Sequence, residues 1–127
     1  MKLKFIQGMM LILTLAIFAG CTKTEKSGYG NYIIGVSNSS SKGYNIQVFL
    51  DGSSKGSFNV IATQTGNYTA LCGDLVHAST LDNVFILTLV ANGKHTVELK
   101  DLSTGFVYSS SDFTMEVDGC ISQQFNF

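Results

Sequence analysis

Arginine, proline and tryptophan are missing from the 127 residues, and only 13% of the chain is charged. Eight lysines against nine acidic residues give a net charge of −1, and no basic stretch follows the N-terminus. Because contacts with nucleic-acid phosphates need clustered positive charge, usually including arginine, we expect no nucleic-acid partner. The length allows one domain and leaves little room for a second.

The first twenty residues are organised as an export signal. Lys2 and Lys4 form a short positive region, and an apolar run follows at 9–18. A run of about ten residues has the length of a signal-peptide core and is too short to cross the roughly 30 Å of a bilayer as a permanent helix. Two small residues, Ala19 and Gly20, then precede Cys21.

The segment Phe18-Ala19-Gly20-Cys21 resembles the lipobox of bacterial lipoproteins. The resemblance implies cleavage before Cys21 and diacylation of its sulfur, so that palmitate-type chains anchor the protein to a membrane. Position 22 is Thr rather than Asp, which by the same resemblance favours the outer membrane. The alternative is an ordinary secretory signal followed by a chance cysteine.

The predicted layout therefore has three parts. These are a lipoprotein signal peptide at 1–20, a lipidated cysteine with a polar, flexible tether at 21–31, and a folded domain at 32–127. Without the signal, six lysines oppose nine acidic residues. The folded domain is thus mildly acidic, and its membrane partner is reached through Cys21.

Apolar residues of the folded part recur with a period of two rather than 3.6, which is typical of β-strands. The alternation predicts strands around 44–50, 96–100, 113–117 and 121–127, with further strands at 32–36, 58–62 and 67–71. Residues 84–90 are apolar on both faces, which predicts a central strand. No convincing amphipathic helix is evident; Asp74 could cap a short one, but the segment 74–81 allows only about two turns.

Turn signals separate these strands. Asp51-Gly52, Asn92-Gly93 and Ser103-Thr104-Gly105 each predict a hairpin, the last two on either side of the strand around Val97. We therefore predict an all-β fold, a single antiparallel β-sandwich of about seven to nine short strands.

Residues Leu89 to Leu99 resemble the L-x-x-x-G-x-H/Y-x-V-x-L hairpin of immunoglobulin-like and transthyretin-like sandwich domains of small bacterial lipoproteins. The likeness covers mainly residues 84–120. Cys72-Gly73 and Cys120 show a weaker similarity to the same domains. It implies an immunoglobulin-like or transthyretin-like sandwich. The resemblance does not assign a function to any residue of this chain.

The cysteines suit an exported domain. With Cys21 lipidated, Cys72 and Cys120 remain as an even pair, which predicts a disulfide between them. Two alternatives use the same loop: a reactive Cys72 thiol assisted by His77, and a metal site formed by His77 with Asp74 and Asp82. We expect neither, because exported thiols usually pair and a zinc site needs three or four ligands at workable spacing.

No constellation of catalytic residues is evident, so we expect neither an enzyme nor a cofactor. The carboxylates of Asp101, Asp112, Glu116 and Asp118 have no defined separation for glycoside chemistry. His95 is expected to be a partly exposed ring beside Lys94.

Recognition is expected on aromatic side chains and on loops. The candidate binding surface comprises Phe49 and Tyr68, on outward faces, and Asp74 and His77, in the loop 72–83. For Phe49 we favour a place in the core over an outward-facing one. We expect a non-enzymatic, lipid-anchored envelope lipoprotein that binds or assembles with a protein or a glycan. The alternative is a periplasmic inhibitor of a cell-wall lytic enzyme, of the lysozyme-inhibitor type, with Cys72–Asn83 as its rigid loop.

Overall fold

The fold is an all-β sandwich, as predicted. The computed structural model describes residues 26–64 and 71–127. The described residues form seven strands and two short helical segments: β1 (Tyr29–Ser37), β2 (Tyr44–Leu50), β3 (Ser53–Val60), η1 (Leu71–Gly73), α1 (Leu75–Ala78), β4 (Val84–Ala91), β5 (Gly93–Asp101), β6 (Val107–Met115) and β7 (Cys120–Asn126). Among these residues no helix has the length and apolar character needed to cross a membrane.

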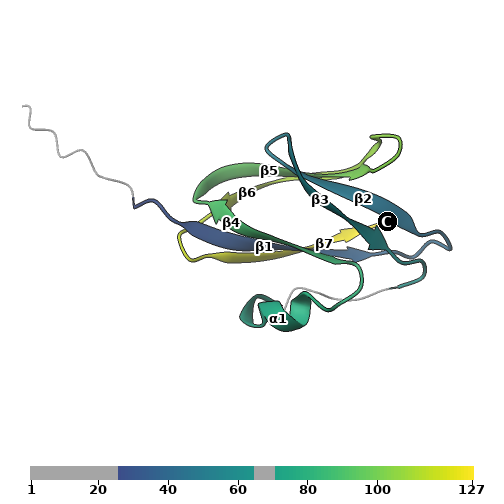
Figure 1. Cartoon of the computed structure of the whole chain (residues 1–127), viewed down its shortest axis with the longest axis horizontal. Coiled ribbons are helices and arrows are strands. Elements are labelled where there is room, and N and C mark those ends of the chain that lie inside the picture. The colour runs from purple at the N-terminus through teal and green to yellow at the C-terminus, as the bar shows by residue number, and fades with distance from the viewer. Residues whose placement is uncertain (1–25, 65–70) are drawn as a thin grey trace, which may run out of the picture.

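The strands form two packed sheets, one with the order β4-β1-β7 and one with the order β3-β2-β5-β6. Figure 1 shows the sheets as two layers, with α1 on the outer side of the three-stranded sheet. All pairings are antiparallel except that of β1 with β7, which is parallel. Because these two strands run the same way, the start of β1 and the C-terminus lie at opposite ends of the sandwich (Figure 1).

The predicted alternation of apolar and polar residues is confirmed in the strands that form the core. Ile46 and Val48 of β2 are fully buried, as are Val97 and Leu99 of β5. Met115 of β6 and Phe125 of β7 complete the pattern, being 1% and 5% exposed. The odd- and even-numbered positions of each strand therefore point to opposite faces, as the period of two requires.

The prediction that residues 84–90 form a central strand is wrong. β4 pairs only with β1 and lies at the edge of its sheet. The central strand is β1, where Ile33 is fully buried although it faces away from the core that contains Tyr32 and Ile34. The segment containing η1 contacts β1 and β7 and covers that outer face. Leu89 of β4, in contrast, is 75% exposed.

The turns agree with the sequence at two of three places. Asp51 and Gly52 join β2 to β3 with positive φ angles of 51° and 80°, as a tight hairpin turn requires. The Ser103-Thr104-Gly105 turn joins the paired strands β5 and β6. The predicted Asn92-Gly93 hairpin is wrong, because β4 and β5 belong to different sheets and this connection crosses from one layer to the other.

Several boundaries differ from those predicted. β1 begins at Tyr29, inside the predicted tether, and β3 begins at Ser53 rather than near Phe58. The short helix that Asp74 could cap is present, with the Asp74 carboxylate accepting a hydrogen bond from the backbone N–H of His77 at 2.9 Å. Of the predicted strand 67–71, residues 67–70 lie outside the described residues and Leu71 begins η1.

Candidate functional site

A pocket of about 450 Å³ opens beside the turn between β2 and β3, where this turn meets β5 and β6. The register of the two strands pairs Lys94 with Thr114 and Thr96 with Asp112. Paired residues share one face of a sheet, so these four polar side chains gather on the outer face, opposite buried Val97. The full lining consists of Asp51, Lys94, His95, Thr96, Asp112, Phe113 and Thr114.

The hairpin turn after β2 brings Asp51 to this pocket. Its backbone N–H donates to the carbonyl of Thr96 at 2.9 Å, which continues the pairing of β2 with β5 by one residue. In return, the backbone N–H of Thr96 donates to Asp51 Oδ1 at 2.9 Å. The carboxylate is therefore fixed by the backbone of the neighbouring strand.

His95 is held at both ring nitrogens. Nδ1 lies 2.6 Å from Asp51 Oδ2, and Nε2 lies 2.6 Å from the backbone oxygen of Ala91. A carboxylate and a carbonyl are both acceptors, so both bonds form only when the ring carries two protons and a positive charge. The side chain is 12% exposed, and its ring lies 5.4 Å from that of Phe113.

These contacts shift the ionisation of both partners. Burial lowers the pKa of His95, but the hydrogen bonds to Asp51 and Ala91 outweigh burial, so the pKa is raised overall from its ordinary value of 6.5. The hydrogen bond from His95 lowers the pKa of Asp51, and that from the Thr96 backbone lowers it further. The pair is thus stabilised as imidazolium and carboxylate.

Thr96 also fixes a second carboxylate. Its hydroxyl donates to Asp112 Oδ1 at 2.6 Å, while its backbone N–H holds Asp51. No ion pair or hydrogen bond engages the Lys94 side chain within residues 26–64 and 71–127, and that side chain is exposed. The pocket therefore offers two positioned carboxylates and one exposed ammonium group.

Neither ring nitrogen of His95 is free to take up a proton. A general base needs a free ring nitrogen within reach of the proton that it removes. Both nitrogens of His95 are engaged, and the neighbouring Thr96 hydroxyl donates to Asp112 instead of to the ring. Among the described residues, no three His, Cys, Asp or Glu side chains are grouped to hold a metal ion.

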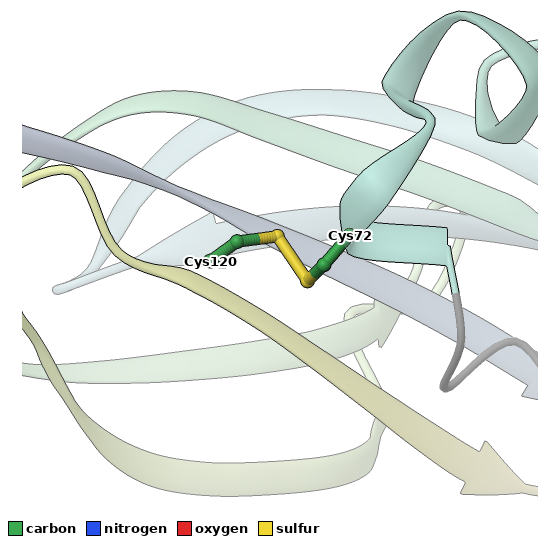
Figure 2. The surroundings of a disulfide bond; sticks show 2 residues. All are labelled: Cys72 and Cys120. Carbon is green, nitrogen blue, oxygen red and sulfur yellow. A yellow bond between two sulfur atoms is a disulfide. The ribbon is translucent and has the colours of Figure 1, made fainter.

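The predicted disulfide between Cys72 and Cys120 is confirmed. Figure 2 shows the bond joining the η1 segment to the start of β7, and the two Cα atoms are 5.7 Å apart. The sulfur of Cys72 is therefore not a free thiol, which overturns the alternative of a nucleophile assisted by His77. The bond fixes the beginning of the loop 72–83 against the edge of the three-stranded sheet.

The predicted binding residues do not form one surface. Asp74 caps the N-terminus of α1 and His77 lies on α1, and both are exposed. Phe49 lies on β2 in the other layer, half-buried on the outer face, with Lys100 Nζ 4.4 Å from its ring centroid. The core position expected for Phe49 is therefore wrong. Tyr68 and Cys21 lie outside the described residues.

Sequence reasoning missed the pocket, although it noted Asp51 as a turn residue and Asp112 as an isolated acid. The available signal was an Asp-Gly turn directly after a strand, together with alternating polar residues at 94 and 96. Only the pairing of β2 with β5 and of β5 with β6 brings these side chains together.

Comparisons with protein-family models, curated proteins and solved structures find no match for the chain.

Proposed function

We propose that this protein is a non-enzymatic, lipid-anchored lipoprotein of the bacterial cell envelope that binds a glycan or a protein through its β-sandwich. The observation that carries the binding role is the pocket in which Thr96 holds both Asp51 and Asp112 in place. Groups that are ordered before a ligand arrives lose little conformational entropy on binding. The occupied nitrogens of His95 support a binding site over a catalytic one.

Two features support a place in the envelope. A disulfide between Cys72 and Cys120 suits an oxidising compartment outside the cytoplasm. The lipobox-like segment ending at Cys21 supplies an anchor, and two or three acyl chains at about 0.8 kcal/mol per buried CH₂ group hold a small domain firmly. Thr22 after this cysteine favours the outer membrane.

The anchor is tested by labelling cells with a palmitate analogue and fractionating their membranes. We expect label in the parent protein and in the outer-membrane fraction, and loss of both in Cys21→Ser. Thr22→Ser is the matched control, since it changes the neighbouring residue but keeps Cys21 and the disulfide. A fully membrane-bound Cys21→Ser variant would contradict the anchor. Protease treatment of intact cells, with a periplasmic marker, then tells which side of the membrane the domain faces.

The loop 72–83 is suited to a second function, which is inhibition of a cell-wall lytic enzyme. The disulfide fixes this loop at one end, and α1 presents Val76 with 80% of its surface exposed beside Asp74 and His77. Such a rigid projecting segment is suited to entering an enzyme cleft. We expect an inhibitor to slow lysis of cell walls by lysozyme at stoichiometric excess and Val76→Asp to abolish the effect. An unchanged lysis rate contradicts this function.

A further inference from the structure

We infer that the pocket formed by Asp51, Lys94, Thr96 and Asp112 binds a neutral saccharide unit. This inference rests on the proposed binding function and names the chemical class of its ligand. Three properties of the pocket point to it: the balance of its charges, the kind of hydrogen-bonding groups that it presents, and its size.

The charges of the pocket cancel. Asp51 and Asp112 are carboxylates, while Lys94 is an ammonium group and His95 is an imidazolium ion when it donates to both of its acceptors. An anionic ligand would approach two carboxylates, and a cationic ligand would approach Lys94 and His95. A neutral ligand meets neither repulsion, so the charge balance favours it.

The hydrogen-bonding groups are mixed in the way that a polyhydroxylated ligand requires. Each carboxylate is an acceptor, Lys94 offers up to three donors, and the hydroxyl of Thr114 does both. Sugar hydroxyls likewise donate and accept. Because Thr96 already orients both carboxylates, a saccharide hydroxyl bound to Asp112 gains a charge-assisted hydrogen bond at little cost in ordering.

The size of the pocket agrees with this ligand. A volume of about 450 Å³ lies at the small end of the range for small-molecule sites, roughly 300–1,000 Å³. Phe113 pairs with His95 across β5 and β6, so its ring lies on the inner side of the sheet beneath the polar groups, where it stacks on buried Tyr32 at a centroid distance of 4.2 Å and supports the floor of the pocket.

The test uses the purified full chain in detergent and immobilised oligosaccharides built from glucose, galactose, mannose or N-acetylglucosamine. Sialylated, sulfated and glucosamine-bearing glycans provide the anionic and cationic comparisons. We expect binding to one or more neutral glycans, and titration calorimetry then measures its affinity. Asp112→Asn and Lys94→Met should each weaken binding by about tenfold or more, because each removes a charged partner. The matched controls Asp82→Asn and Lys42→Met, at exposed sites outside the pocket, should leave the affinity unchanged.

Asp112 and Lys94 are exposed, so these substitutions leave the core intact, and far-ultraviolet circular dichroism checks the fold. Thr114→Val provides a further pocket variant if either of the first two fails to fold. Binding to charged glycans alone, binding to none, or equal affinity of parent and pocket variants would overturn the inference. If Cys21 is acylated but no saccharide binds, only the inference fails. If saccharides bind but Cys21 is not acylated, the envelope anchor fails and the pocket assignment stands.

Discussion

His95 Nδ1 lies 2.6 Å from Asp51 Oδ2 in a bond that closes one end of the sandwich. Asp51 belongs to the turn of the four-stranded sheet, whereas the second acceptor of the ring, Ala91 O, ends β4 of the three-stranded sheet. The imidazolium ring thus bridges both layers next to the Asn92-Gly93 crossover. Since it needs two protons for both bonds, the strength of this bridge depends on pH.

The first prediction is that stability falls as the pH rises above neutrality. The pKa of His95 is raised in the folded state, so its contribution is complete below the ordinary value of 6.5 and is lost as the pH passes through the folded-state pKa. The pKa of Asp51 is lowered, so its contribution is present above 3.8 and is lost as the pH falls through the folded-state value. The bridge is therefore strongest between these two ordinary values.

Urea unfolding at pH 6 and pH 9 measures this effect, and we expect the free energy of unfolding to fall by about 1 kcal/mol. His95→Gln should remove most of the difference between the two pH values. His77→Gln is the matched control, because His77 is exposed on α1 while the ring bonded to Asp51 is that of His95; this variant should retain the difference. Equal pH dependence in the two variants would contradict the assignment to His95.

The second prediction concerns the disulfide. Cys72 and Cys120 are separated by 48 positions, and for such a loop the chain-entropy model gives a stabilisation of about 4 kcal/mol. Small domains have net stabilities of about 5–15 kcal/mol, so the doubly substituted Cys72→Ser, Cys120→Ser chain should be only marginally folded. Urea unfolding with and without a reducing agent tests this.

Reduction should lower the unfolding midpoint of the parent and leave that of the double variant unchanged. An oxidised parent no more stable than the reduced one would mean that the bond adds nothing to the sandwich. Detection of two free thiols in the unreduced protein would contradict the bond itself.

The fold class could be predicted from the sequence because each core strand alternates apolar and polar residues along its own length. Ile46 and Val48, which are both fully buried, illustrate this. The order of the strands within each sheet could not be predicted, because it depends on which parts of the chain pack over each face of a sheet. Residues 84–90 are apolar on both faces yet form an edge strand, whereas β1 is central, and its outward-facing Ile33 is buried in the sheet that the disulfide-linked segment contacts. The pocket was not predictable for a related reason: Asp51 and His95 are 44 positions apart and meet only through strand pairing.

The third prediction concerns Asn83, a buried polar residue with a φ of 59°. Its Oδ1 accepts from the backbone N–H of Ile61 at 2.6 Å, and its backbone oxygen accepts from Val36 N at 2.8 Å. Asn83→Ala leaves the Ile61 N–H without that partner and forces alanine into a left-handed conformation, at a combined cost of about 2–4 kcal/mol.

Asn83→Gly separates the two contributions. Glycine adopts positive φ without steric cost, so this variant should lose the hydrogen bond but regain about 1 kcal/mol relative to alanine. Equilibrium unfolding in urea measures both variants against the parent. Equal stability of the alanine and glycine variants would show that the backbone conformation contributes nothing.

The fourth prediction is a gain of stability at Leu89. This residue has a φ of 55° and is 75% exposed, at the β-bulge where the register of β1 with β4 shifts. A leucine in the left-handed region costs roughly 1–2 kcal/mol, whereas asparagine tolerates that region, and little packing is lost at so exposed a position. Leu89→Asn should therefore raise the free energy of unfolding by about 0.5–1 kcal/mol. Leu102→Asn is the matched control, being 48% exposed with no positive φ. It should give no gain, and a Leu89 variant that behaves like this control would mean that the bulge does not strain the chain.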